Sequence, residues 1–180
     1  MTFRGYRLHV AAAAFLLTLL LGLGARHAAH SASAGALQRD FAALSGVARA
    51  AVERHGGRTD IVLELGPVDD LQAVYRQADM LRRARLPEDA SQLIIKDRRT
   101  DALTEAYRRI HYAVYEGAAT GAFTRMAEAV GEAAAQLAAD VLVTVDDRYI
   151  YVQIVSGDDY LYEVVPVAKA AAGGPRERSG

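Results

Sequence analysis

The chain has 180 residues, no cysteine and a formal net charge of −1. The lack of cysteine excludes disulfide scaffolds, thiolate catalysis and cysteine-ligated metal sites. The residues after Ala34 contain 18 basic and 22 acidic side chains, a formal charge of −4, which argues against a dedicated nucleic-acid binder because such domains are usually basic.

The first 34 residues have the order of an export signal. Arg4 and Arg7 precede an apolar run from Val10 to Gly24, and Ala32-Ser33-Ala34 supplies small side chains for signal peptidase. We therefore expect an extracytoplasmic protein whose N-terminus is held inside by the two arginines. As a helix the run is about 22 Å long, which is long for a signal peptide and short for a bilayer core of about 30 Å. Two alternatives stay open: secretion after cleavage at Ala34, or retention of the run as a single-pass membrane anchor.

Residues 35–58 are predicted to form an amphipathic helix or stalk. Apolar side chains recur there at helical spacing, and Gly56-Gly57 ends the pattern. The recurring residues are Leu37, Phe41, Leu44, Val47, Ala48 and Val52. A single domain is expected to follow over residues 59–167.

The next segment predicts two strands joined by a helix. Ile61–Leu65 and Leu93–Ile95 are short apolar runs bounded by turn and charged residues. The helix between them is expected to be capped by Asp69 or Asp70 and to end near Leu86. Because a helical crossover joins the two strands, we expect them to be parallel neighbours.

Two helices are predicted in the second half of the domain. Thr100 or Asp101 is expected to cap a strongly amphipathic helix that ends at Gly121. Thr124 is expected to cap an alanine-rich helix that continues to about Ala139.

The end of the chain predicts a three-stranded antiparallel meander. Strand-like runs cover residues 141–145, 149–155 and 160–167, separated by acidic and Gly-Asp turns. The fold class is therefore α+β, with a mixed sheet of about five strands covered mainly on one face by helices. Residues 168–180 are expected to be a disordered tail, since their composition cannot build a core.

The sequence predicts no catalytic, cofactor-binding or metal-binding set of residues. His111 is the residue most open to a catalytic role, but it lies in no recognisable motif. The aspartates of the turns at 146–147 and 158–159 are expected at opposite ends of the meander, so we interpret them as turn formers. Two alternatives stay open: a cell-envelope hydrolase in which His111 acts with Glu64, Asp97 or Glu116, and a carrier for a small molecule or lipid.

Two groups of residues are predicted to form interaction surfaces. The first is a tyrosine face on the meander, formed by Tyr149, Tyr151, Tyr160 and Tyr162. The alternative is that this face packs under the helices. The second is a basic surface formed by Arg82, Arg83, Arg98 and Arg99, whose alternative is a solvated, salt-bridged helix surface. We therefore interpret the chain as a binding or assembly module of the bacterial cell envelope, with an envelope protein or a second copy of itself as partner and no nucleic acid.

Overall fold

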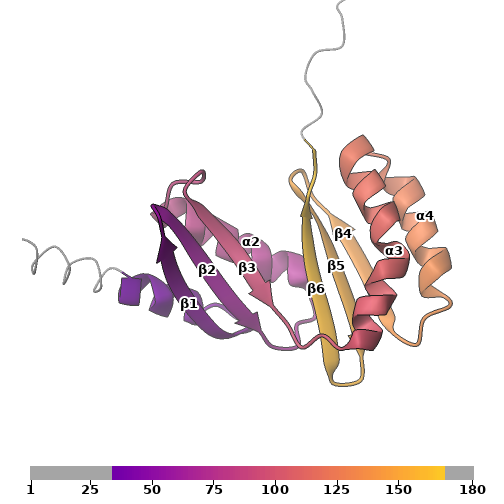
Figure 1. Cartoon of the computed structure of the whole chain (residues 1–180), viewed down its shortest axis with the longest axis horizontal. Coiled ribbons are helices and arrows are strands. Elements are labelled where there is room, and N and C mark those ends of the chain that lie inside the picture. Colours follow the sequence, from indigo (N-terminus) through magenta and orange to yellow (C-terminus); the bar gives the residue numbers. More distant parts are fainter. Residues whose placement is uncertain (1–33, 169–180) are drawn as a thin grey trace, which may run out of the picture.

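The computed structural model describes residues 34–168 (Figure 1). The expected export segment, apart from its last residue, and the expected tail from residue 169 lie outside the described residues, and both stay predictions. Within residues 34–168, no helix combines the length and the apolar character needed to cross a bilayer. This part of the chain is α+β, with two three-stranded sheets and helices.

The first sheet is mixed and has the strand order β1-β2-β3. Its strands are β1 (Val47–His55), β2 (Arg58–Leu65) and β3 (Ser91–Lys96). Helix α2 (Leu71–Arg85) connects β2 to β3, which are parallel, as the sequence predicts. Asp70 caps this helix, because its carboxylate accepts a hydrogen bond from the Ala73 amide at 2.9 Å.

Residues 35–58 are not one helix. Residues 34–42 are helical, and β1 then pairs with β2 in an antiparallel hairpin. The sequence predicts that Gly56-Gly57 ends a helix, whereas in the structure the two glycines connect β1 and β2. Both glycines have positive φ, +55° and +89°, and a two-residue loop with positive φ at both positions matches the right-handed twist of a hairpin. The spacing around Ala50 and Val52 fits a helix and a strand equally well, so pairing with β2 decides the outcome.

Two helices lie between the sheets in the chain, α3 (Asp101–Thr120) and α4 (Phe123–Ala134). Thr100 caps α3 by accepting a hydrogen bond from the Leu103 amide, and Gly121 ends it in the left-handed conformation, both as predicted. Helix α4 begins two residues before the expected start and ends about five residues before Ala139. Its N-cap position is Ala122, which has no side-chain oxygen, so Thr124 does not cap this helix.

The second sheet is the predicted antiparallel meander. Its strands are β4 (Asp140–Val145), β5 (Tyr149–Ser156) and β6 (Asp159–Pro166). Successive residues of β5 face opposite sides, and both sides are buried. One side contributes Ile150, Val152 and Ile154 to a core with α3 and α4, whereas the tyrosine side faces α2 and the first sheet.

The six strands form two sheets instead of the single sheet of about five strands that the sequence predicts. One isolated bridge, between Arg98 and Tyr160, joins the sheets. Pairing stops beyond it because side chains take the backbone groups of Tyr162. The Asp97 carboxylate accepts from the Tyr162 amide at 2.7 Å, and the Arg99 guanidinium donates to the Tyr162 carbonyl at 3.4 Å.

Candidate functional site

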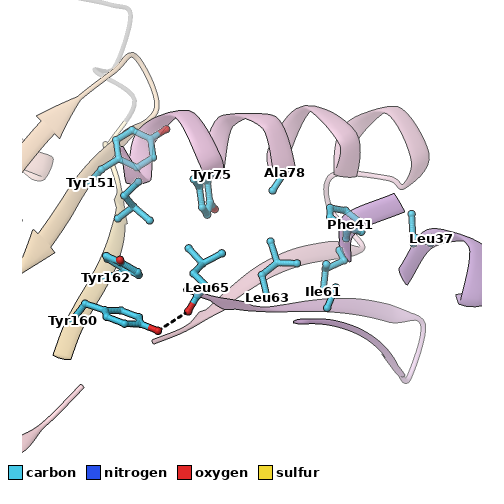
Figure 2. Close-up of a cluster of buried hydrophobic side chains, with 12 residues drawn as sticks. Leu37, Phe41, Ile61, Leu63, Leu65, Tyr75, Ala78, Tyr151, Tyr160 and Tyr162 are labelled. Carbon is cyan, nitrogen blue, oxygen red and sulfur yellow. Dashed lines mark hydrogen bonds between the residues drawn. The ribbon is translucent and has the colours of Figure 1, made fainter. Parts of the chain in front are cut away.

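The meander tyrosines predicted as an interaction surface lie largely inside the molecule (Figure 2). Tyr151, Tyr160 and Tyr162 are 1, 9 and 1% exposed, and Tyr149 is half-buried. Tyr149 and Tyr151 pack edge-on against Tyr75 of α2, with ring centroids 5.2 and 5.8 Å apart. This placement corresponds to the alternative in which the tyrosine face packs under a helix. The expected exposed face is therefore corrected to a core that joins the two sheets.

The tyrosine hydroxyls hold the backbone at the end of β2. Tyr160 donates to the Leu65 carbonyl at 3.0 Å, the contact drawn as a dashed line in Figure 2. The Tyr162 hydroxyl accepts from the Val68 amide at 3.0 Å and donates to the Gly66 carbonyl at 3.2 Å. The Leu65 contact is buried and the other two are part-buried, so the hydroxyls satisfy backbone atoms that water reaches poorly. Burial is also the main cause that raises the pKa of Tyr162.

Gln153 completes the support of this loop. Its side-chain amide donates to the Val68 carbonyl at 2.7 Å, and its side-chain carbonyl accepts from the Leu71 amide at 3.3 Å. Leu71 is the first residue of α2, so Gln153 fixes the start of the helix. The tyrosine hydroxyls and the Gln153 side-chain amide thus hydrogen-bond to the segment that follows β2. A tyrosine or glutamine side chain can make these bonds, whereas an apolar side chain cannot.

Arg82 and Arg83, predicted as part of a basic surface, lie at the end of α2. Arg82 is only 4% exposed. Its guanidinium donates to the Asp79 carboxylate at 2.7 Å, and to the carbonyl and hydroxyl of Ser91 at 3.1 and 3.0 Å. Arg83 pairs with the same carboxylate. Since Ser91 begins β3, Arg82 acts as a buried clamp between helix and strand rather than as a surface charge.

Arg98 and Arg99, the other half of the predicted basic surface, lie past the opposite end of β3. Arg98 pairs with Asp159 at 3.2 Å. Arg99 contacts both Asp97, at 2.8 Å, and Glu163, at 2.9 Å, and the hydrogen bond with Asp97 is the main cause that raises its pKa. The structure therefore separates the four predicted arginines into two groups about 20 Å apart along the strand. Each group is paired with carboxylates.

The aspartates of the two turns have structural partners. Asp146 closes the β4–β5 turn by accepting from the amides of Arg148 and Tyr149, both at 2.9 Å, and from the Tyr151 hydroxyl at 2.7 Å. Asp159 is engaged with Arg98, at the other end of the sheet. Among residues 34–168, no group of three or more histidine and acidic side chains is arranged to hold a metal ion.

An exposed aromatic cluster on α3 is the most conspicuous surface feature in the described part of the chain. Tyr112 and Tyr115 are 78 and 55% exposed. Both rings contact His111, with centroids 3.9 and 6.5 Å apart, and Tyr107 lies 6.1 Å from the same histidine. We call these four residues the α3 cluster. Burial is the main cause that raises the pKa of Tyr107, followed by the charge of Glu163.

His111 is fixed by its own helix. One ring nitrogen, Nδ1, lies 2.6 Å from the Arg108 carbonyl oxygen, the closest polar contact of the ring. Two of the carboxylates considered as its catalytic partners are engaged elsewhere: Asp97 with Arg99, and Glu116 with Arg125 at 3.6 Å. Within the described residues, His111 therefore contacts neither of these two carboxylates, and the hydrolase stays a prediction from the sequence.

The exposure of the α3 cluster has a signal in the sequence. The apolar stripe of α3 contains Leu103, Ile110 and Val114, which are buried against the meander. Tyr112 and Tyr115 lie off this stripe, three residues apart, so they share the opposite face of the helix. Large aromatic side chains on the solvent face of an otherwise regular amphipathic helix are a recognisable departure from the pattern.

Two open grooves flank the meander. The first, about 430 Å³, lies between α3 and the β5–β6 turn and carries charges from Glu105, Arg109 and Asp159. The second, about 440 Å³, lies beside the loop after β2 and includes Asp69 and Asp158.

No protein-family model and no curated protein matches this chain. The tyrosine core, the Arg82 clamp and the acidic turns are explained by folding. The α3 cluster is not, because its two most exposed rings are uncovered.

Proposed function

We propose that this protein is an extracytoplasmic binding module that contacts a protein partner through the α3 cluster. Export is supported by the basic residues, apolar run and small residues of the first 34 positions. Whether the module is secreted or anchored by residues 10–24 is left open by the same sequence. The observation that carries the proposal is the exposure of Tyr112 and Tyr115 beside His111.

The cluster has the composition of an interaction hot spot. Tyrosine is enriched in protein interfaces because its ring is apolar and its hydroxyl makes hydrogen bonds. The His111 ring packs against Tyr112 and is held by the Arg108 carbonyl, so both rings are partly ordered before any partner arrives. Ordering in advance lowers the entropy lost on binding, which favours affinity.

The charges around the cluster favour a protein over a polyanion. Arg108 lies 3.4 Å from Glu105, and Arg125 lies 3.6 Å from Glu116, so the nearby arginines have acidic neighbours on the same surface. Nucleic acids and anionic lipids are instead recognised by clusters of unpaired basic residues. A partner with a small apolar pocket and hydrogen-bond acceptors at its rim fits two projecting tyrosines.

Site-specific photocrosslinking tests the proposal in cells of the source organism. A photoreactive aromatic residue replaces Tyr112 or Tyr115 in the full chain, and the matched control replaces Met80 on α2, which is 62% exposed. We expect one discrete crosslinked protein from positions 112 and 115 and none from position 80. A crosslink that is identical at all three positions, or absent at the two tyrosine positions, would count against the proposal.

A further inference from the structure

We propose that β1 is a self-complementary edge strand through which two copies of this chain pair, so that the first sheet continues across a two-fold axis. This surface is separate from the α3 cluster. It lies at the open end of the first sheet, because the strand order is β1-β2-β3 and β1 pairs only with β2 within residues 34–168. An unpaired strand edge offers a row of backbone donors and acceptors to another strand.

β1 is long enough for edge pairing and has no proline to interrupt it: it has nine residues. Its register with β2 shifts once, between Val47 and Arg49, and is regular from Arg49 to His55, the stretch that the proposed pairing uses. The β6 edge of the second sheet is different. There Asp97 and Arg99 occupy the backbone groups of Tyr162, and the strand ends at Pro166, which has no amide hydrogen. The chain therefore closes the β6 edge and leaves the β1 edge open.

The charged side chains of β1 favour a second copy of the same strand as the partner. In an antiparallel pair of identical strands, opposite residues must have the same backbone orientation, so the two-fold axis passes through a residue. Centred on Ala51, the pairing places Arg49 opposite Glu53 of the second copy, and Glu53 opposite Arg49. Two symmetric pairs of opposite charge result, and the smallest chiral side chain meets itself at the axis.

Neighbouring registers lose this complementarity. Centred on Ala50, the pairing places Arg49 opposite Ala51 and Glu53 opposite Val47. Centred on Val52, it places Arg49 opposite His55 and Glu53 opposite Ala51. Neither alternative contains a charge pair between Arg49 and Glu53, so the strand selects a single register.

The repulsion between Glu53 and Asp60 within one copy also favours pairing with a second copy. Glu53 stands directly opposite Asp60 of β2, and like charges at such positions are unfavourable. Arg49 is exposed and stands opposite Glu64 on the β2 side of the strand. The second copy brings Arg49 to the free side of Glu53, which relieves the repulsion between the Glu53 and Asp60 carboxylates.

The absence of cysteine makes the register directly testable. Opposite Cβ atoms of an antiparallel pair lie about 4.5–5.5 Å apart, close to disulfide distance. Under mild oxidation of the full chain we therefore expect Ala51→Cys to form a covalent dimer. Ala48→Cys is the matched control on the same strand. In the proposed register its two copies are six residues apart along the strand, about 20 Å, so it should not crosslink.

Reversing the charges at positions 49 and 53 provides a second test of the proposed pairing. We expect Arg49→Glu to raise the dimer dissociation constant about tenfold or more, measured by sedimentation equilibrium, since it replaces two attractive pairs by two repulsive ones. The double variant Arg49→Glu with Glu53→Arg should restore dimerisation. A monomeric wild-type chain, equal crosslinking at positions 48 and 51, or no rescue by the double variant overturns the proposal. None of these results bears on partner binding by the α3 cluster.

Discussion

Removing the hydroxyl of Tyr162 should destabilise the fold far more than the same change at an exposed tyrosine. In Tyr162→Phe the ring still fills its buried site, but the amide of Val68 and the carbonyl of Gly66 lose their partner. A buried polar group left unsatisfied costs about 1–3 kcal/mol. Because Val68 is only part-buried and water can replace some of the loss, we expect a decrease of about 2 kcal/mol in the free energy of unfolding.

Urea unfolding followed by circular dichroism measures this change, with Tyr112→Phe as the control. Tyr112 is 78% exposed, so its substitution should alter stability by no more than about 0.5 kcal/mol. Hydrogen exchange at the Val68 amide should also accelerate in Tyr162→Phe. If the two variants unfold at the same urea concentration, the hydroxyl does not hold the loop after β2, and the proposed role of the tyrosine core is wrong.

Three further outcomes follow from the structure. Arg82→Leu leaves the buried carboxylate of Asp79 without its main partner and should cost about 3 kcal/mol in urea unfolding, whereas a small change would show that the clamp is unimportant. Gly57→Ala should lower stability by about 1–2 kcal/mol because φ is +89° there, while a helix at this position would give the opposite sign. Burial raises the pKa of Tyr75 and Tyr151, so the unfolded state loses these protons first. The free energy of unfolding should thus be constant just below about pH 10 and decrease as the pH rises further. A urea midpoint that stays constant above that pH would contradict this prediction.

Local signals in the sequence predict most of the fold. Asp70 and Thr100 cap their helices, Gly121 ends α3, and the acidic and Gly-Asp turns mark the meander. These features depend on a few neighbouring residues, which is why they are readable without the structure. β1 is different, because its spacing suits a helix and only pairing with β2 makes it a strand.

The division into two sheets could not be read from local patterns. It depends on Asp97 and Arg99 occupying the backbone of Tyr162, a contact between residues 63 or more positions apart. The same limit applies to the predicted surfaces. Strand spacing places Tyr149 and Tyr151 on one face, but only the packing of α2 shows that this face is internal. The exposed rings of the α3 cluster were recognisable as neighbours in the sequence, although not as a surface.

The binding of the crosslinked partner to purified variants tests the central claim most directly. Titration calorimetry compares the full chain with the double variant Tyr112→Ala and Tyr115→Ala, and with Met80→Ala as a matched exposed control. Loss of two hot-spot rings should weaken binding at least tenfold, since such residues contribute about 1–2 kcal/mol or more each. The control should bind like the wild type. Equal affinity of all three proteins for the partner would contradict the assignment of the α3 cluster as the binding surface.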